Sequence, residues 1–206
     1  MLPWVFVDVL TTALLELQID PRAATLIVVG MFAGAAINIP VRRIEREEWV
    51  PIDPFAMFRW RGARLALERS RRDTIIAINV GGCVIPASLA AYEIARLAPA
   101  GAAPALAGAV VINAGVCYLL ARPVRGIGIV MPGLLPPLMA ASSAWLLAPE
   151  HATPIAFVAG TLGPLIGADL LQLREVRLLD SGLVSIGGAG TFDGILLSGI
   201  VALYLA

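Results

Sequence analysis

Two aspartates inside apolar segments are the residues of this chain best placed to do chemistry. They lie in Gly167-Ala168-Asp169-Leu170 and in Gly190-Thr191-Phe192-Asp193-Gly194. A carboxylate within the hydrocarbon of a bilayer is costly, so an acid in such a segment indicates a functional site. Two close carboxylates can share a proton, one acting as a base toward water and the other as an acid toward a carbonyl. The pair therefore predicts acid–base catalysis.

Each aspartate also has a simpler, structural interpretation. A carboxylate can pair with an arginine or cap the end of a helix without taking part in a reaction. Arg174 follows Asp169 closely in the sequence, whereas no charged residue follows Asp193. The structural interpretation is therefore stronger for Asp169 than for Asp193.

The segment before Asp193 is rich in glycine, because residues 185–190 read Ser-Ile-Gly-Gly-Ala-Gly. Such a cluster weakens a helix, and a break within lipid is tolerated where the backbone is buried in protein or lines a cavity. We expect an unwound segment that enters the membrane from the cytoplasm, then a helix that begins near Thr191. The break would bring Asp193 back toward the cytoplasmic leaflet, at the depth of Asp169. Alternatively, the glycines only allow close helix packing.

Three asparagines also fall within the apolar segments. Asn38 and Asn79 stand near the cytoplasmic ends of their segments, and Asn113 stands near the middle of its own. Hydrogen bonds between helices would explain each of them. Because they share a leaflet with the two aspartates, we expect one polar cavity that opens to the cytoplasm. Its supporting residues would be Asn38, Asn79, Asn113, Gly167, Gly190 and Thr191.

The elements that must position these residues are long apolar segments. The chain has 206 residues, of which 59% are hydrophobic and 15% charged, whereas a soluble domain carries about 25% charge. Segments of about 18 residues can cross a bilayer as helices, and none alternates as barrel strands do. The segments run over 2–18, 23–40, 74–97, 104–121, 126–148, 154–172 and 183–206. We expect a single all-α domain, a transmembrane bundle of six or seven helices.

Two details of this bundle stay open at the sequence level. The first segment, 2–18, is short and carries Asp8 and Glu16, so it decides between six and seven spans. The segment 126–137 contains Pro132, Pro136 and Pro137, and proline removes a helical hydrogen bond. We therefore expect one or two broken helices, at 126–137 and at 185–190.

The arginines give the bundle a direction across the membrane. All 15 basic residues are arginine, and 13 of them fall in the alternate loops 41–73, 122–125 and 173–182. They are Arg42, Arg43, Arg46, Arg59, Arg61, Arg64, Arg69, Arg71, Arg72, Arg122, Arg125, Arg174 and Arg177. Only Arg22 and Arg96 fall on the other side. The positive-inside rule predicts that the arginine-rich side faces the cytoplasm and that the C-terminus lies outside.

The 41–73 loop is the largest segment expected outside the lipid. It mixes nine arginines with six acidic residues. Its aromatic and apolar residues are Trp49, Phe55, Met57, Phe58 and Trp60. Aromatic side chains beside arginines are typical of a segment at the lipid headgroups, so we expect a cytoplasmic interfacial loop. A docking surface for a partner is the alternative.

The remaining reactive residue types do not predict a metal site or a cofactor. Cys83 and Cys117 both fall inside apolar segments, which is typical of buried, inert thiols. His151 is the single histidine and has no cysteine or carboxylate at metal-ligand spacing. The net charge is zero, so nothing indicates binding to nucleic acid, and the expected surroundings are the lipid bilayer.

Several stretches are similar to a family of prokaryotic membrane proteins known as domain of unknown function 1614. They are Ile37 to Pro40, Asn79 to Pro86, and the long run from Gly160 through Asp169 to Gly194. They are spread along most of the chain, and the resemblance implies a location in a prokaryotic inner membrane. Because the family name carries no established activity, this resemblance implies the fold class and leaves the reaction open.

A more distant resemblance is to the intramembrane aspartyl proteases, which include presenilins, signal peptide peptidases and prepilin peptidases. These use two membrane aspartates, one of them in a Gly-x-Gly-Asp motif. Here Gly190 and Asp193 match that motif, whereas Phe192 replaces its second glycine, and 167–169 matches in part. The resemblance implies that Asp169 and Asp193 are catalytic and that the substrate is a transmembrane peptide.

The leading hypothesis is thus an intramembrane diaspartyl protease with a polar cavity open to the cytoplasm. The alternative is a transporter or channel in which the same acids bind a proton or a cation at a broken helix. A third hypothesis is a membrane scaffold without enzymatic activity that uses the 41–73 segment. Contact between the two carboxyl groups favours the protease, whereas a polar path through both leaflets favours transport.

Overall fold

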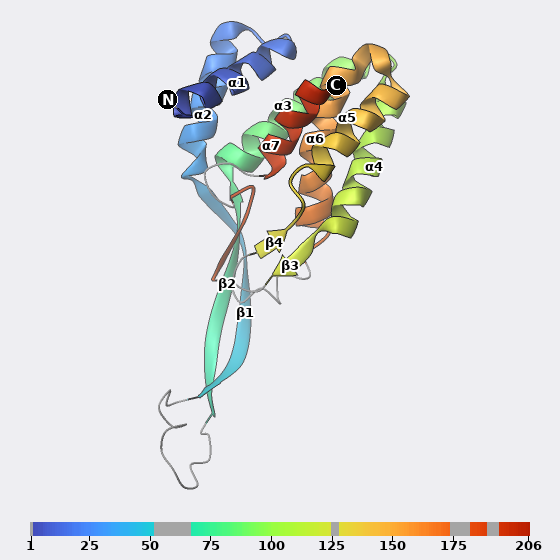
Figure 1. Ribbon diagram of the computed structural model, residues 1–206. Helices are drawn as coiled ribbons and strands as arrows, with labels where there is room; N and C mark the ends of the chain where they lie inside the picture. The colour runs from blue at the N-terminus through green and yellow to red at the C-terminus, as the bar shows by residue number, and fades with distance from the viewer. Residues whose placement is uncertain (1, 52–66, 125–127, 174–181, 189–193) are drawn as a thin grey trace.

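The computed structural model describes residues 2–51, 67–124, 128–173, 182–188 and 194–206. It consists of a helix bundle and a long β-hairpin that projects from one end of the bundle (Figure 1). We call this end the hairpin end. The shorter strands lie at the same end (Figure 1).

Seven α-helices form the described part of the bundle. They are α1 (Leu2–Glu16), α2 (Pro21–Ala35), α3 (Ile85–Leu97), α4 (Ala103–Leu120), α5 (Leu135–Leu147), α6 (Ala152–Pro164) and α7 (Gly194–Leu205). Two π-helical segments and a short 3-10 turn extend them: η2 (Val80–Val84) before α3, η3 (Pro149–His151) before α6 and η4 (Leu165–Leu170) after α6.

Three helical stretches are long and apolar enough to cross a membrane by length and composition. They are Val80–Leu97, Ala103–Leu120 and Pro149–Leu170, whereas Pro21–Ala35, Leu135–Leu147 and Gly194–Leu205 are apolar but shorter. The described residues therefore do not provide the expected six or seven membrane-length helices. Several apolar segments of the sequence are helical over only part of their length, because their ends form strands and turns.

Helix α6 is the centre of the bundle and contacts α3, α4, α5 and α7. Its side chains at Ile155, Phe157 and Val158 have no exposed surface. Gly160 lies against α7, where a Cβ atom would come within 2.8 Å of both the Ala202 Cβ and the Ser198 carbonyl oxygen. Such small residues allow helix backbones to approach closely, which favours association in a membrane.

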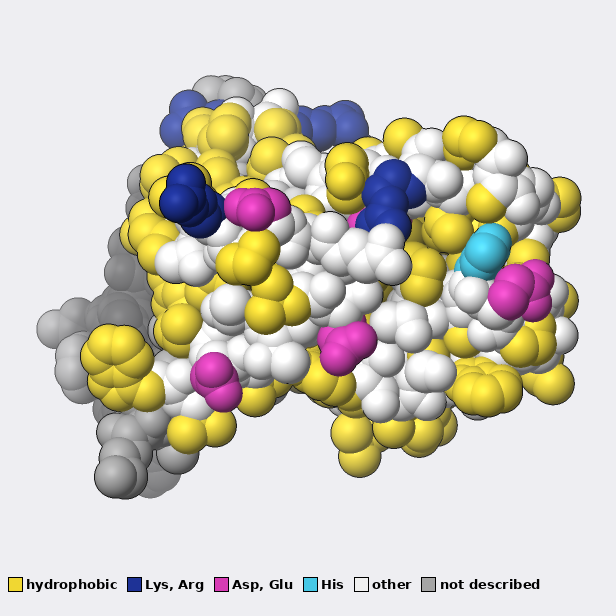
Figure 2. Space-filling model, turned by 90° about the horizontal axis from the view of Figure 1, so that it is seen from above, with side chains coloured by type: hydrophobic (Ala, Val, Ile, Leu, Met, Phe, Trp, Pro, Cys, Tyr) yellow, Lys and Arg dark blue, Asp and Glu magenta, His cyan; other side chains and the backbone are white. Residues whose placement is uncertain are grey.

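The outside of the bundle is apolar. Large hydrophobic side chains are exposed on several helices, including Trp4 at 79%, Leu119 at 78% and Leu146 at 84%. Figure 2, which views the end of the bundle opposite the hairpin, shows hydrophobic side chains around the rim and separate acidic and basic groups between them. An apolar surface of this extent is unusual for a soluble monomer and is typical of helices that face lipid or a partner.

The hairpin corrects the expectation of an all-α fold. Strands β1 (Asn38–Pro51) and β2 (Leu67–Asn79) pair antiparallel, and β5 (Leu183–Ile186) adds to β2 in parallel. The described residues of the 41–73 segment, 41–51 and 67–73, are therefore strand and not loop. The strand ends at 38–40 and 74–79 were expected to belong to spans. They are apolar and rich in β-branched isoleucine, which suits a half-buried strand as well as a helix.

The expected span at 126–148 also begins differently. The described residues start with a small hairpin of β3 (Arg122–Val124) and β4 (Gly128–Val130), and α5 begins only at Leu135. Pro136 and Pro137 lie in the first turn of α5, where the missing N–H groups cost no hydrogen bond. The prolines thus start a helix here and do not break one.

The expected break before Asp193 is confirmed for the residues that the structure describes. Leu183–Ile186 is a strand, and Gly187 has a φ of 72° in the left-handed region that favours glycine. A Cβ at Gly187 would also lie 2.8 Å from the Cys83 backbone nitrogen. The glycine therefore permits both the turn after β5 and its close contact with η2.

Candidate functional site

Asp169 lies in the π-helical segment η4 at the hairpin end of α6. Pro164 ends the regular helix because it has no N–H group to donate to the preceding turn. The chain continues with a wider turn, in which the Leu171 N–H donates to the Ile166 carbonyl five residues earlier at 2.9 Å. Such π-turns occur frequently at functional sites. This turn sets the direction in which residues 165–170 leave the bundle axis.

Asp169 lines a pocket with a volume of about 490 Å³. Three parts of the chain form it: the segment from β4 into α5, the end of α6 with η4, and the first turns of α7. The lining residues are Ile129, Val130, Met131, Gly133, Pro136, Pro164, Ala168, Asp169, Gly194, Ile195 and Ser198. The pocket is apolar apart from Asp169 and Ser198, and this combination is typical of a small-molecule or peptide side-chain site.

Ser198 brings an unusual hydroxyl to this pocket. Ser198 is 4% exposed, and its Oγ atom has no hydrogen-bond partner within the described chain. Thr161 on α6 is the other residue whose buried hydroxyl has no partner among the residues that the structure describes, and it lies against Gly199 of α7. A buried hydroxyl without a partner is costly, so each requires an explanation.

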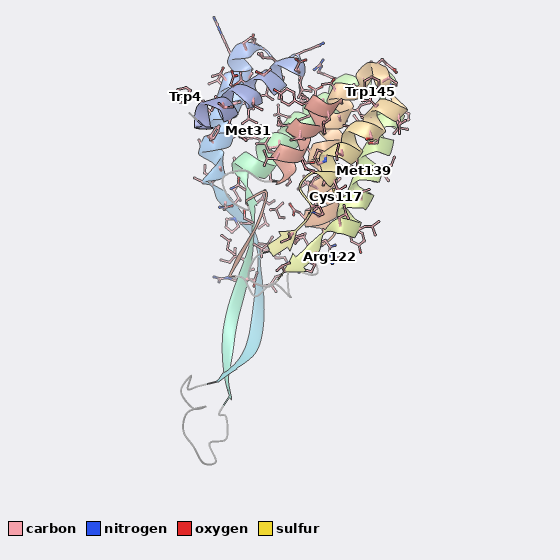
Figure 3. All side chains as sticks on the ribbon, viewed as in Figure 1. Trp4, Met31, Cys117, Arg122, Met139 and Trp145 are labelled. Carbon is pink, nitrogen blue, oxygen red and sulfur yellow. The ribbon has the colours of Figure 1, made fainter. Side chains whose placement is uncertain are left out.

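Gly167 fixes η4 against α4. A Cβ atom at Gly167 would collide with the Ala114 carbonyl oxygen and would lie 2.8 Å from the Cys117 Cβ. Cys117 is fully buried and is close enough to Asp169 to interact with it electrostatically. Figure 3 shows Cys117 in the half of the bundle nearer the hairpin, whereas Trp145 lies at the far end. Gly167 therefore supports the site by permitting this backbone contact.

Asn113 lies deeper in the bundle than Asp169. Its side chain is fully buried, and its Nδ2 donates to the Ala159 carbonyl of α6 at 2.8 Å. Gly163 makes room for this amide, because a Cβ there would collide with Asn113. Asn113 thus joins α4 to α6 by a hydrogen bond between helices, which is one of the two roles that the sequence predicted for it.

Asn38 and Asn79 form a separate polar junction at the base of the hairpin. Asn79 donates to the Ala35 carbonyl at 2.8 Å and to Asn38 Oδ1 at 3.2 Å, and its own Oδ1 accepts from the Gly82 N–H at 2.8 Å. Ser185 of β5 donates to the same Asn38 oxygen at 2.5 Å. The junction fastens α2, η2 and β5 together. None of the three asparagines lines the Asp169 pocket as described, so the expected single cavity is divided into separate polar sites.

The second aspartate of the sequence hypothesis, Asp193, lies outside the described residues, as do Gly190 and Thr191. Gly194 directly follows Asp193 in the sequence, begins α7 and lines the Asp169 pocket. The described chain on both sides of 189–193 therefore returns to the hairpin end of the bundle.

One buried acid was missed by the sequence analysis. Glu93 on α3 is 1% exposed and forms an ion pair with Arg96 at 3.0 Å. Arg96 also donates to the Leu17 carbonyl at 2.6 Å and to Gln18 Oε1 at 2.9 Å, beyond the end of α1. The spacing of three residues between the acid and the arginine could have revealed this pair. Its contacts fasten α1 to α3, far from Asp169, so its role is structural.

No group of three or more histidine, cysteine, aspartate or glutamate side chains gathers within the described ranges. Cys83 and Cys117 are both buried, and neither forms a disulfide within the described part of the chain. The chemistry of the pocket therefore rests on a carboxyl group and a hydroxyl group.

Comparison with known proteins identifies one family. Its sequence model, described as protein of unknown function (DUF1614), matches residues 32–205. No curated protein and no solved structure matches the chain. The matched range contains η4, the pocket and α7, whereas all of α1 and most of α2 precede it.

Proposed function

We propose that this chain, which belongs to the DUF1614 family of proteins of unknown function, is an intramembrane peptidase that uses Asp169 and Asp193. The observation that carries the proposal is the pocket at the hairpin end of α6. Asp169 lines it from η4, and Gly194, the covalent neighbour of Asp193, lines it from α7. Consecutive Cα atoms are about 3.8 Å apart, and we propose that Asp193 acts at the same pocket.

The apolar exterior of the bundle supports a location in a membrane, with the hairpin end in the cytoplasm of a prokaryotic cell. The exposed Trp4, Leu119 and Leu146 would contact lipid. Seven of the nine arginines in the described ranges lie in β1, β2 or β3, at the hairpin end. Positive charge accumulates on the cytoplasmic side of membrane proteins.

The proposed reaction is hydrolysis of a peptide bond in an unwound transmembrane segment. One aspartate is ionised and takes a proton from water as the water oxygen bonds to the carbonyl carbon. The other is protonated and donates its proton to the carbonyl oxygen, which gives a gem-diol. The C–N bond then breaks, a proton passes to the amine nitrogen, and the products are a carboxyl and an amino terminus.

Transport of a proton or cation by the same acids is less well supported. A transport path would have to continue from Asp169 through the bundle to the opposite end. The described core of α6 beyond the pocket is mostly apolar, with Ile155, Phe157 and Val158 fully buried, and its buried polar groups are the isolated Thr161 hydroxyl and the Asn113 amide. A pocket that ends against such a core suits a reaction with a substrate that enters from one side.

The experiment uses full-length protein in detergent micelles and a tagged peptide with one apolar span of about 20 residues as the probe. We expect cleavage by the wild type and none by Asp169→Asn or Asp193→Asn. The double variant should be no worse than either single variant, because groups that act as a unit are not additive. Asp8→Asn changes an exposed acid of α1 and should cleave normally. Undiminished cleavage by Asp169→Asn would refute the proposal.

A further inference from the structure

We propose that the Ser198 hydroxyl donates a hydrogen bond to the carbonyl oxygen of the peptide bond that is cleaved. This inference rests on the peptidase function proposed above and adds a third residue to it. Ser198 would act as a catalytic residue that contacts the substrate, whereas the surrounding pocket residues provide its apolar walls. The argument begins with the hydrogen bonds of the other hydroxyl groups in the bundle.

A serine or threonine in a helix usually donates to a carbonyl of its own preceding turn. Four such residues do so here. Each hydroxyl donates to a backbone carbonyl three or four residues earlier: Thr11 to Val7 at 2.8 Å, Thr25 to Pro21 at 2.9 Å, Ser88 to Val84 at 2.8 Å, and Ser143 to Ala140 at 3.0 Å. Ser198 has Gly194 one turn earlier and yet makes no such bond within the described chain.

The position of Ser198 on α7 explains where its hydroxyl can find a partner instead. Residues separated by four positions share a helix face. Gly194 and Ser198 share such a face, and both line the pocket together with Ile195. Ser198 therefore stands one turn deeper than the point at which the chain leaves Asp193. A substrate carbonyl between Asp169 and α7 would meet this hydroxyl.

The proposed reaction would be accelerated by a second hydrogen-bond donor at the carbonyl oxygen. Negative charge develops on the carbonyl oxygen as water adds, and donors held in a pocket of low polarity stabilise that charge. The protonated aspartate supplies one donor to this oxygen, and no arginine stands among the described lining residues to supply another. A neutral hydroxyl donates without changing how the two carboxyl groups share their proton. Substrate binding would also satisfy the buried hydroxyl, which explains its lack of a partner in the chain.

The first test compares Ser198→Ala with Ser143→Ala. Both serines are buried, at 4% and 5% exposure, but the Ser143 hydroxyl already has a partner in its own helix. For cleavage of the tagged peptide we expect Ser198→Ala to lower kcat about a hundredfold with little change in KM, as for other donors to a developing oxyanion. Ser143→Ala should retain the wild-type kcat. Equal kcat values for Ser198→Ala and the wild type would overturn the inference.

The second test does not depend on turnover. In a variant with Cys83→Ala and Cys117→Ala, a cysteine replaces either Ser198 or Ser143 and is exposed to a small water-soluble thiol reagent. We expect Ser198→Cys to react, and to be protected by a peptide whose scissile bond is replaced by a hydroxyl-bearing carbon. Ser143→Cys should remain unreactive.

The two proposals fail in different ways. An unreactive Ser198→Cys in a chain that still shows cleavage dependent on Asp169 would refute only the role of Ser198. Absence of cleavage dependent on Asp169 in the wild type would refute the peptidase function and, with it, the substrate carbonyl as the partner of Ser198.

Discussion

The Gly167 backbone lies directly against the Ala114 carbonyl oxygen, with no room for a Cβ atom between them. This contact holds η4, and therefore Asp169, against α4. The neighbours on the α4 side are largely backbone atoms, which cannot move aside as the end of a flexible side chain can. The contact links the stability of the bundle to the geometry of the pocket.

We predict that Gly167→Ala destabilises the protein by about 3 kcal/mol, the upper end of the usual range for overpacking, because backbone must move. The same variant should lose peptide cleavage, since Asp169 is displaced with η4. Gly115→Ala is the matched control on α4, because a Cβ there meets nothing within 4 Å. It should be neutral or stabilising by about 0.5 kcal/mol. Thermal unfolding in detergent measures both, and equal midpoints would contradict the prediction.

The Asn79 side chain gives a second prediction. Asn79→Ala leaves the Ala35 carbonyl and the Gly82 N–H without the partners that they have now. We expect a loss of about 2 to 4 kcal/mol, because each buried group without a partner costs about 1 to 3 kcal/mol. Asn38→Ala should cost less, since Asn38 is exposed and water can replace its contacts. Denaturant unfolding compares the two variants, and an Asn38→Ala variant as unstable as Asn79→Ala would argue against this assignment.

Arg96 provides a prediction at the opposite end of the bundle. Arg96→Ala leaves the buried Glu93 carboxylate without its ion pair and removes the hydrogen bond to the Leu17 carbonyl. Removing one partner of a buried pair costs about 3 kcal/mol or more, and we expect the lower end because Arg96 is partly exposed. Arg22→Ala, at an exposed position, should have little effect. The thermal midpoints of the two variants should therefore differ clearly, and matching midpoints would disprove a structural role for the pair.

Thr161 should respond in the opposite direction. Its hydroxyl is fully buried and has no partner within the described chain, so Thr161→Val removes an unsatisfied group and keeps the shape. We expect a stabilisation of about 1 kcal/mol. Thr11→Val, which removes a bonded hydroxyl, should not stabilise. A fall in the unfolding midpoint of Thr161→Val would show that the hydroxyl has a partner in the folded protein.

The sequence predicted the helices best where apolar residues fill a whole element. The expected span 104–121 corresponds to α4 at Ala103–Leu120. The prediction of a membrane helix was wrong at 74–79, which is strand. A run of threonine, isoleucine and alanine suits a strand as well as a helix, and only pairing with 38–44 decides between them. Such pairing joins residues that are distant in the chain, and apolar periodicity does not report it.

The candidate site was predicted in part for a similar reason. Asp169 was proposed as a site residue because a carboxylate is rare within an apolar segment. Ser198 was not found, because serine in an apolar helix is ordinary and only its hydrogen bonding distinguishes it from Ser143. Asn38 and Asn79 were grouped with Asp169 by depth alone, whereas the structure places them at a separate junction, where they hydrogen bond to each other. Depth along a helix does not determine the face on which a residue lies.

The proximity of Asp169 and Asp193 is the central claim, and a disulfide tests it most directly. The variant carries Asp169→Cys and Asp193→Cys together with Cys83→Ala and Cys117→Ala, and it is oxidised mildly in native membranes. Two cysteines form a disulfide readily only when their Cα atoms are within about 7 Å. We predict rapid, nearly complete formation of the intramolecular disulfide, and none when Asp8→Cys replaces Asp193→Cys. Two reactive thiols that stay uncrosslinked under the same oxidation would show that the two positions do not share a pocket.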